Sequence, residues 1–417
     1  MDHVSIFLIS LSGLFLSGIA AEILFKRTRI PDALWLVGLG ILIGPIFNLV
    51  SSDFLEKLLP FFAAFALIVI LFEGGRQLSL RSLKSTVGRA TLLGVLSFGV
   101  SGFAAALFSW LGVLIGVLQD WTWLKAGMFG AIVGGSSSII IIPTMQIGQV
   151  KEDVANLVTV ESAVTDAFCV VLAFVFLQMV LFSGQADLNS SSDGAVRLLE
   201  SVGFGVVLGG LAGFFWVFIL PWIPSSYSYL ITLSALFGFY VLVQELGGSA
   251  ALAILIFAVI VGNAGIIGRL SKLQGRRLIG DEVGIVHLQL SFVVKVFFFV
   301  IVGALLRPPF LPMLFGILLA GVLVGVRPLA VRWGLMKSDF SQDDRKMINI
   351  CAPRGLAAGV LATLPLTQGV SGVDDLSTIV FAVIVTTIVV FAVFFRKLQV
   401  SIPPSPETSV GIENNGA

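Results

Sequence analysis

The stretch Glu161-Ser162-Ala163-Val164-Thr165-Asp166 places two carboxylates inside an apolar segment that covers about residues 155–182. A segment of this length is typical of a helix that crosses a lipid bilayer. A charged side chain at the centre of such a helix costs at least about 2.5–3.5 kcal/mol on insertion scales, so it indicates a functional position. The two acids lie about 140° apart around a helix and about 7.5 Å apart along it. We therefore expect Glu161 and Asp166 to face different partners within one cavity rather than to share one proton.

The composition of the whole chain is that of a polytopic membrane protein. Of its 417 residues, 57% are hydrophobic and 12% are charged, whereas a soluble domain carries about 25% charged residues. Cys169 and Cys351 both lie in apolar segments, so their spacing predicts neither a disulfide framework nor a metal site. No cofactor, no catalytic group and no nucleic-acid partner is expected. The first apolar run has no basic start and no cleavage site, and we interpret it as a retained span.

Apolar runs near the required length of about 20 residues predict thirteen membrane spans in an all-α fold. The expected spans are residues 4–25, 33–50, 58–75, 89–118, 124–148, 155–182, 197–220, 227–243, 249–262, 285–306, 310–334, 347–365 and 376–396. The polar residues 401–417 that follow are expected to form a disordered cytoplasmic tail, and no soluble regulatory domain is expected.

Basic residues between the expected spans predict the orientation of the chain. One side carries Lys26, Arg27, Arg29, Arg76, Arg81, Lys84, Arg89, Lys151, Arg269, Lys272, Arg276, Arg277, Lys337, Arg345, Lys346, Arg396 and Lys397. The other side has Lys57, Lys125, Arg197 and Arg307 as its basic residues. Because basic loops stay in the cytoplasm, we expect the N-terminus outside and the C-terminus inside, in the inner (plasma) membrane.

Two of the expected spans contain helix breakers at matching places. Spans 2–6 and 9–13 each hold five helices and start from opposite sides, as an inverted repeat requires. The fourth helix of the first group contains Gly134-Gly135-Ser136-Ser137-Ser138, and the fourth helix of the second contains Pro353-Arg354-Gly355. Broken helices at corresponding positions mark the binding site in such folds. We therefore expect helices 5 and 12 to be broken at one shared site.

Asp166 lies about eleven residues into its helix, near the middle of the membrane. A carboxylate there can bind a small cation or a proton, but one bound charge neutralises it and so excludes the other. The alternative interpretation is a structural carboxylate that is hydrogen-bonded to a neighbouring helix.

Neutral oxygen ligands are available close to Asp166 in the sequence. Thr165 and Ser162 precede it on the same helix, and Ser136, Ser137 and Ser138 lie in the break of helix 5. Hard monovalent cations prefer several oxygen ligands, and unwound backbone adds carbonyl groups without further charge. Alternatively, each hydroxyl bonds to a carbonyl in the preceding turn of its own helix.

Glu161 needs a positive partner, and three cations lie inside expected spans: Lys295, Arg327 and Arg354. A Glu161–arginine pair would be structural, because a paired carboxylate stays ionised. Arg354 lies in a helix break, where it can face the half-helix ends or keep the site positive when no cation is bound. Lys295 is expected to extend to the membrane surface or to pair with an acid, with a direct role in transport as the alternative. Glu73 is either an interfacial acid beside Arg76 or a cation-attracting group in a cytoplasmic funnel.

Four stretches carry motifs that together resemble one known family. They are Leu71-Phe72-Glu73-Gly74-Gly75, Glu161-Ser162-x-x-Thr165-Asp166, Gly247-Gly248-Ser249-Ala250-Ala251-Leu252-Ala253 running to Gly262-Asn263, and Arg354-Gly355-Leu356-Ala357. The chain resembles the monovalent cation:proton antiporter superfamily, and is most similar to the thirteen-helix sodium/proton exchangers of prokaryotes. The four motifs span nearly the whole chain.

The resemblance implies a homodimer that exchanges Na⁺ or K⁺ for protons. Residues 1–400 would form the membrane transport unit, with an elevator-type core of helices 4–6 and 11–13 moving against a dimerisation domain. It also implies that Asp166 is the exchanging carboxylate and that Glu161 pairs with Arg327. With one titrating carboxylate, we expect electroneutral one-to-one exchange.

Two departures from the family pattern concern ion selectivity. The family's fifth helix usually reads Thr-Asp-Pro, whereas this chain has Ser136-Ser137-Ser138, which looks more like the Ser-Ser-Thr of the potassium-efflux branch. The residue before the exchanging acid is Thr165 instead of Asn. K⁺-selective, proton-coupled efflux therefore stays open as an alternative. An ion channel and a sodium-coupled solute symporter are the alternatives from other classes.

Overall fold

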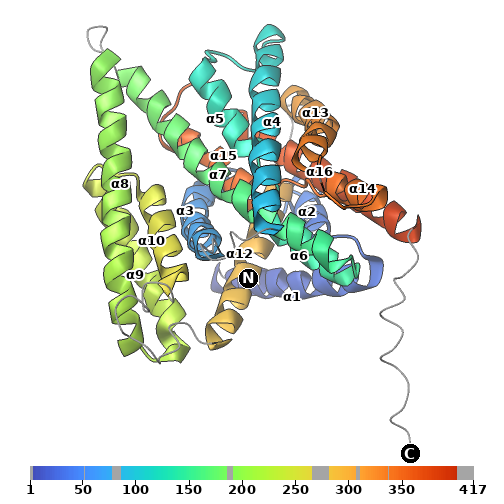
Figure 1. The fold of residues 1–417 in the computed structure, drawn as a ribbon, viewed down its shortest axis with the longest axis horizontal. Coiled ribbons are helices and arrows are strands. Elements are labelled where there is room, and N and C mark those ends of the chain that lie inside the picture. Colours follow the sequence, from blue (N-terminus) through green and yellow to red (C-terminus); the bar gives the residue numbers. More distant parts are fainter. Residues whose placement is uncertain are drawn as a thin grey trace, which may run out of the picture.

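A computed structural model describes residues 3–50, 52–77, 86–185, 191–264, 281–306, 310–336 and 338–401, and these ranges are helical throughout apart from short connections (Figure 1). Among these residues, seven helices are long and apolar enough to cross a membrane, and shorter apolar helices accompany them. The protein is therefore an all-helical, multi-pass membrane protein. The expected tail after Ser401 and the basic residues Arg81, Lys84, Arg269, Lys272, Arg276 and Arg277 lie outside the described ranges.

Helices cover each of the segments that hydropathy predicted as spans. In the first half they are α1 (His3–Thr28), α2 (Asp32–Ile41), α3 (Ser52–Gln77), α4 (Thr86–Leu114), α5 (Trp123–Val133), α6 (Ser138–Ile147) and α7 (Glu152–Gln185). In the second half they are α8 (Ser191–Ile219), α9 (Ser225–Glu245), α10 (Ala250–Gly262), α12 (Asp281–Leu305), α13 (Phe310–Gly334), α14 (Gln342–Ile350), α15 (Leu356–Thr367) and α16 (Leu376–Ser401). Several helices extend a few residues beyond the apolar run, because polar residues also form helical turns.

The second expected span ends earlier than its hydropathy suggests. After α2, residues Leu42–Ile46 form a π-helical turn that contains Pro45, and the helix stops there rather than at residue 50. Proline has no N–H group to donate to the preceding turn, and its ring crowds the carbonyl four residues earlier. A wider π turn accommodates such a defect.

Both expected helix breaks are present. The fifth span divides into α5 and α6, which are separated by residues 134–137, and the twelfth divides into α14 and α15, which are separated by residues 351–355. Gly134 and Gly135 lie in the first gap, and Pro353 and Gly355 lie in the second. Proline cannot donate a helical hydrogen bond, and glycine has a low helix propensity, so both sequences favour an interruption.

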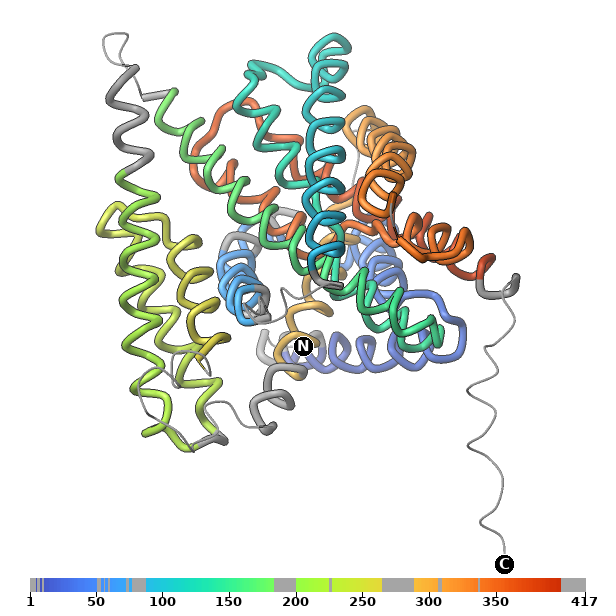
Figure 2. Tube along the Cα trace, viewed as in Figure 1, coloured from blue at the N-terminus to red at the C-terminus, as the bar shows by residue number. Residues whose placement is uncertain are grey.

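The helices form two groups that meet in the middle of the molecule. In Figure 1, α8, α9 and α10 lie on the left, α13, α14 and α16 lie on the right, and α7 runs diagonally between them. The tube in Figure 2 shows the same course without side chains. α4 packs against α5, α7 and α13, and α13 packs against α16. In the other group, α2 packs against α12, and α10 packs against α3, α8 and α9.

Glycine permits the closest helix contact in this second group. A Cβ atom added to Gly40 of α2 would lie 2.2 Å from the carbonyl oxygen of Val300, and one added to Gly303 of α12 would lie 2.2 Å from the carbonyl oxygen of Val37. The two backbones thus touch where both residues lack a side chain, as small residues allow in membrane helix pairs. This contact fixes α2 and α12 as one unit.

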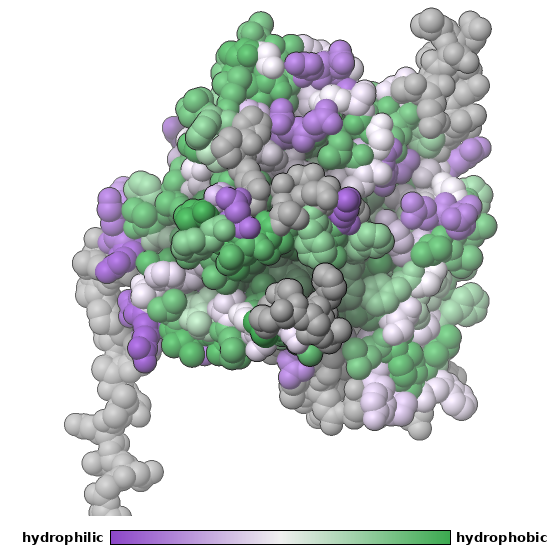
Figure 3. Space-filling view, turned by 180° about the vertical axis from the view of Figure 1, so that it is seen from behind, coloured by the Kyte–Doolittle hydropathy of each residue, from purple (hydrophilic) through white to green (hydrophobic). Residues whose placement is uncertain are grey.

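The surface is that of a protein surrounded by lipid. Large hydrophobic side chains such as Phe103, Phe215 and Leu314 are exposed, and the view from behind shows hydrophobic residues over much of that face, with hydrophilic residues in scattered groups (Figure 3). Water would disfavour so much exposed apolar area, whereas acyl chains do not.

We predict that Gly40→Ala destabilises the protein, whereas Gly38→Ala on the same helix does not. The added methyl group at position 40 would collide with the backbone of α12, while position 38 has nothing within 4 Å. Overpacking of this kind costs about 1–3 kcal/mol, and alanine in an open helical position gains up to about 1 kcal/mol over glycine. Thermal unfolding of the purified variants in detergent measures the difference. Equal melting temperatures for the two variants would contradict the packing described above.

Candidate functional site

The two helix breaks cross at the centre of the molecule and are bonded to each other. The backbone N–H of Ser137 donates to the carbonyl oxygen of Pro353 over 2.8 Å. At Gly355, a Cβ atom would lie 2.0 Å from Oγ of Ser137, so only glycine permits this approach. The Arg354-Gly355 dipeptide and the serine run, which are far apart in the sequence, therefore form one structure.

The crossing brings two helix N-termini close to each other. α6 begins at Ser138 and α15 begins at Leu356, directly after the residues that touch. The free N–H groups and the dipole give each helix start a partial positive charge. An anion is favoured at such a position. This region can therefore accommodate one carboxylate.

Asp166 is the carboxylate at this position. Its Oδ2 accepts a hydrogen bond of 2.9 Å from the hydroxyl of Ser138, the first residue of α6. The side chain is partly exposed, and it forms no ion pair with any residue that the structure describes. Asp166 thus has one hydroxyl partner, a favourable helix end and no fixed positive partner.

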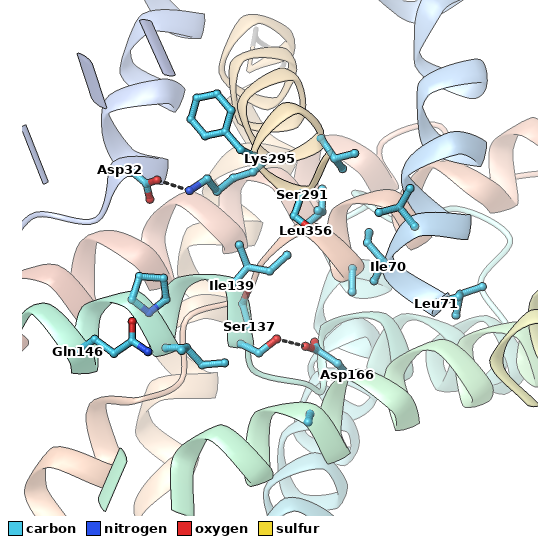
Figure 4. A pocket seen from close by; sticks show the side chains of 18 of the residues that line it. Asp32, Ile70, Leu71, Ser137, Ile139, Gln146, Asp166, Ser291, Lys295 and Leu356 are labelled. Carbon is cyan, nitrogen blue, oxygen red and sulfur yellow. Dashed lines mark hydrogen bonds and ion pairs between the residues drawn. The ribbon is translucent and has the colours of Figure 1, made fainter. Parts of the chain in front are cut away.

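A cavity of about 590 Å³ gives access to Asp166 (Figure 4). Ser137, Ser138, Ile139 and Leu356 line it near the crossing, and Ile70, Leu71 and Leu255 form part of its apolar wall. The lining also includes Glu22 and Lys26 of α1, whose side chains are largely exposed. The cavity therefore extends from the carboxylate to the molecular surface beside the end of α1.

Glu161 occupies a different environment on the same helix. Both of its carboxylate oxygens accept hydrogen bonds from the guanidinium of Arg327, and that arginine also donates to Ser97 over 2.7 Å and to the carbonyl of Ile348 over 3.1 Å. Glu161 is fully buried and Arg327 is 2% exposed. The ion pair that the resemblance implies is therefore present. Neither residue lines the cavity that Asp166 faces, so the expectation that both acids face one cavity is wrong.

Three of the five candidate hydroxyl ligands form a closed group beside Asp166. Ser136 contacts Ser162 over 3.1 Å and Thr165 over 3.2 Å, and its backbone N–H donates to Thr165. The hydroxyl of Thr165 donates in turn to the carbonyl of Ser162. All three residues are buried and none lines the cavity. Ser137 and Ser138 do line it. The structure thus separates the candidates into two at the cavity and three that join α7 to the break.

Arg354 lies in the second break and is 2% exposed. Its guanidinium donates to the carbonyl of Ala352, its backbone N–H donates to Thr387, and its Nε has no partner among the described residues. None of the ion pairs in the described ranges includes Arg354. Its charge therefore acts on the site through space rather than through a salt bridge.

Lys295 pairs with an acid, one of the two arrangements expected for it. The acid is Asp32, at the start of α2, which the sequence analysis did not single out. Asp32 directly follows a proline at a helix start, and at such a position an acid is expected to act as a capping residue.

Gln146 and Ser291 also line the cavity, and the sequence analysis likewise did not single them out. Glu73 lies in α3, but its side chain lies outside the described part of the chain.

An ion pair joins the start of α7, which carries Asp166, to the first turn of α14. Lys151, just before α7, lies 2.9 Å from Asp344 in the first turn of α14. Asp344 lies before the expected span at residues 347–365, and Ser341 caps the same helix through a capping box. Partial burial raises the pKa of Asp344, but hydrogen bonds from Lys151 and Ser341 outweigh it and hold the pKa below its ordinary value. The pair therefore stays ionised at neutral pH and fixes α14 to α7.

The chain is similar to known membrane proteins over nearly its full length. The family model described as "Sodium/hydrogen exchanger, transmembrane" matches residues 11–397. A K(+)/H(+) antiporter, NhaP2 of Shewanella sp. (strain MR-4), is 28% identical, over 97% of this chain and 70% of its own length. A probable Na(+)/H(+) antiporter 2 of Methanocaldococcus jannaschii is 24% identical, over 88% of this chain and 86% of its own.

A solved structure shares the fold. The sodium proton antiporter MjNhaP1 from Methanocaldococcus jannaschii, at pH 8, superimposes with a TM-score of 0.71 at 21% sequence identity. The superposition covers 94% of this chain and 98% of that one.

We predict that Glu161→Gln and Arg327→Met each destabilise the protein strongly. Either change leaves one buried charge without its partner, which costs about 3–5 kcal/mol. The double variant should lose less than the sum of the two, because it leaves no unpaired charge. Thermal unfolding in detergent gives the three values, and a double variant that loses the full sum would show that the two residues act independently.

Proposed function

Because the chain belongs to the sodium/hydrogen exchanger family of membrane proteins, we propose that a monovalent cation and a proton bind in turn to Asp166 and are carried in opposite directions. The protein would then be a secondary antiporter, which uses the gradient of one ion to move the other. It is a transporter and not an enzyme.

The environment of Asp166 is the observation that carries this proposal. A transported ion needs a binding group that it can reach and leave, and Asp166 is partly exposed to a cavity that extends to the surface. Glu161 on the same helix is fully buried and bonded through both oxygens. The accessible acid is thus suited to exchange, while the inaccessible acid is suited to a structural role.

One carboxylate can support exchange because a monovalent cation and a proton carry the same charge. A cation at Asp166 would be held by the carboxylate, by the hydroxyls of Ser138 and Ser137, and by water from the cavity. Ser136, Ser162 and Thr165 would hold the break in position behind it. Arg354 would stabilise the carboxylate of Asp166 when neither a cation nor a proton is bound, since an unpaired charge in an apolar interior is costly. With a cation or a proton bound, the Asp166 site is neutral and can pass an apolar barrier.

The pairing of helices supports an inverted repeat. In an inverted repeat, each helix of spans 2–6 has a counterpart in spans 9–13: α2 corresponds to α10, α3 to α12, α4 to α13 and α7 to α16. The contact between α2 and α12 then corresponds to the contact between α10 and α3, and the contact between α4 and α7 corresponds to the contact between α13 and α16. All four pairs are among the helix contacts of the structure, and α4·α13, which maps onto itself, is a further one. We propose thirteen spans, a core of α4–α7 and α13–α16 that moves as an elevator, and a dimerisation domain from the remaining helices.

The charge distribution supports an orientation with the N-terminus outside and the C-terminus in the cytoplasm. Under that orientation the cavity mouth beside Lys26 faces the cytoplasm, and the structure is an inward-facing state. The exposed apolar face of α8, which carries Phe204, Phe214 and Phe215, would contact lipid or the second subunit of a homodimer.

Both Na⁺ and K⁺ remain candidates for the cation. The serine run in the first break provides neutral hydroxyls where the exchanger pattern has an acid, which weakens the local field and favours the larger, less strongly hydrated K⁺. Relatives named as K(+)/H(+) and as Na(+)/H(+) antiporters both match this chain.

We predict that Asp166→Asn abolishes exchange and leaves the fold intact. The amide keeps the size of the side chain but binds neither a proton nor a cation at neutral pH. Dissipation of a pH gradient in proteoliposomes, with Na⁺, K⁺ and Li⁺ added in turn, measures transport. Ser183→Ala is a matched control, because that hydroxyl bonds within its own helix near the end of α7. Transport by Asp166→Asn at the wild-type rate would remove Asp166 from its proposed role.

We further predict that exchange is electroneutral, with one proton for each cation. Glu161 is held in its ion pair, so one carboxylate per protomer titrates during transport. A potential-sensitive dye in the same vesicles should show no change while the pH gradient collapses. A membrane potential generated by antiport would require a second titrating group.

A further inference from the structure

The cavity that leads to Asp166 contains more charges than the exchange itself needs. Five charged residues line it among those that the structure describes: Glu22, Lys26, Asp32, Asp166 and Lys295. Glu22 and Lys26 form an exposed pair of 3.0 Å at the mouth. Asp32 and Lys295 form a second pair further in. With three acids and two lysines, the lining carries a net charge of −1, and this charge corresponds to the unpaired Asp166.

The inner pair lies in the cavity wall that faces α6 and α7. Asp32 comes from α2 and Lys295 comes from α12, while Asp166 projects from α7 on the other side, with Ile139, Ser291 and Leu356 between them (Figure 4). The side chains of Asp32 and Lys295 are 8% and 16% exposed. The cavity that reaches Asp166 is therefore also lined by a carboxylate that already holds an ammonium group.

Fixed contacts hold both partners in place. Oδ1 of Asp32 accepts from the backbone N–H of Ala33 over 2.9 Å, and its Oδ2 accepts from Lys295. Nζ of Lys295 also lies 5.9 Å from the ring centroid of Phe292, a cation–π distance. α2 and α12 already touch through Gly40 and Gly303, so the pair is not needed to join them. A buried ion pair is in any case weak evidence for a stabilising role.

We propose that Asp32 is a second cation site in the entry path, that the ammonium of Lys295 occupies it as a tethered cation, and that this occupancy sets the apparent cation affinity of Asp166. The Lys295 ammonium neutralises Asp32, so that Asp166 is the carboxylate left unpaired among the described residues of the cavity lining. This inference rests on the proposed function, because it concerns the path to the exchanging acid.

The proposal requires opposite effects from removal of the two partners. Asp32→Asn keeps the shape and the acceptor for Ala33 but leaves an unpaired ammonium in the cavity, which repels incoming cations. Lys295→Met keeps the apolar stem but leaves Asp32 free to bind a cation from solution. At an effective dielectric constant of about 20, a unit charge roughly 12 Å from a bound cation changes its affinity by on the order of tenfold, and we take this as the size of the expected effect. A purely structural pair would instead give the same direction of change in both variants.

The test combines transport kinetics with ion counting at fixed pH. In proteoliposomes, Asp32→Asn should raise the apparent KM for the cation about tenfold, and Lys295→Met should lower it, each with turnover at saturation near the wild-type value. Lys295→Arg should keep the wild-type KM because it keeps the charge. Lys26→Gln at the exposed mouth is the matched control and should change KM little, because exposed charges are screened.

Equilibrium binding of radiolabelled Na⁺ or Rb⁺ to the purified protein counts the sites directly. Wild-type protein and Lys295→Arg should bind one ion per protomer, and Lys295→Met should bind two. One ion bound to Lys295→Met, or KM shifts in the same direction for Asp32→Asn and Lys295→Met, would overturn the proposal. If wild-type protein binds one ion but exchanges none, the proposed function fails, while the ion counts still decide on Asp32.

Discussion

The buried pair between Glu161 and Arg327 is the interaction on which the rest of the site depends. One guanidinium contacts α7 through Glu161, α4 through Ser97 and the end of α14 through the carbonyl of Ile348, while it projects from α13. Charges can stay in an apolar interior only when they are paired and hydrogen-bonded. The pair therefore fixes four elements relative to one another, and these include α7, which carries Asp166, and α14, which leads into the second helix break.

This arrangement gives two similar acids on one helix two different roles. Glu161 lies in a closed, fully bonded environment, and its charge is permanently balanced. Asp166, about 1.4 turns later, faces a cavity and a helix start, and the helix start stabilises a negative charge without neutralising it. Arg354, which forms no ion pair with any described residue, adds a positive field. A carboxylate in these surroundings can release one bound positive ion and bind another, which is the basic requirement for exchange.

Much of the fold could be predicted from the sequence because lipid imposes simple rules. Twenty apolar residues make a span, and glycine and proline interrupt it, so the helices and both breaks were predicted close to their observed positions. Asp166 and Glu161 were also identified, since a charge inside a span is costly. The prediction was less complete for hydroxyls: Ser136, Ser162 and Thr165 were expected as ligands, but they bond to one another away from the cavity. A one-dimensional pattern cannot tell which side of a break a hydroxyl faces.

The sequence by itself determined that the chain spans a membrane many times, where its helices break and which acids lie at membrane depth, because these properties follow from the local cost of polarity in lipid. The tertiary structure alone decided which charges meet. Asp32 and Lys295 are separated by 263 positions, and Ser137 and Pro353 belong to different halves of the chain. Such pairs form only when helix packing brings distant segments within a few ångströms. In Glu161-Ser162-Ala163-Val164-Thr165-Asp166, packing also decided which acid is enclosed and which one opens to the cavity.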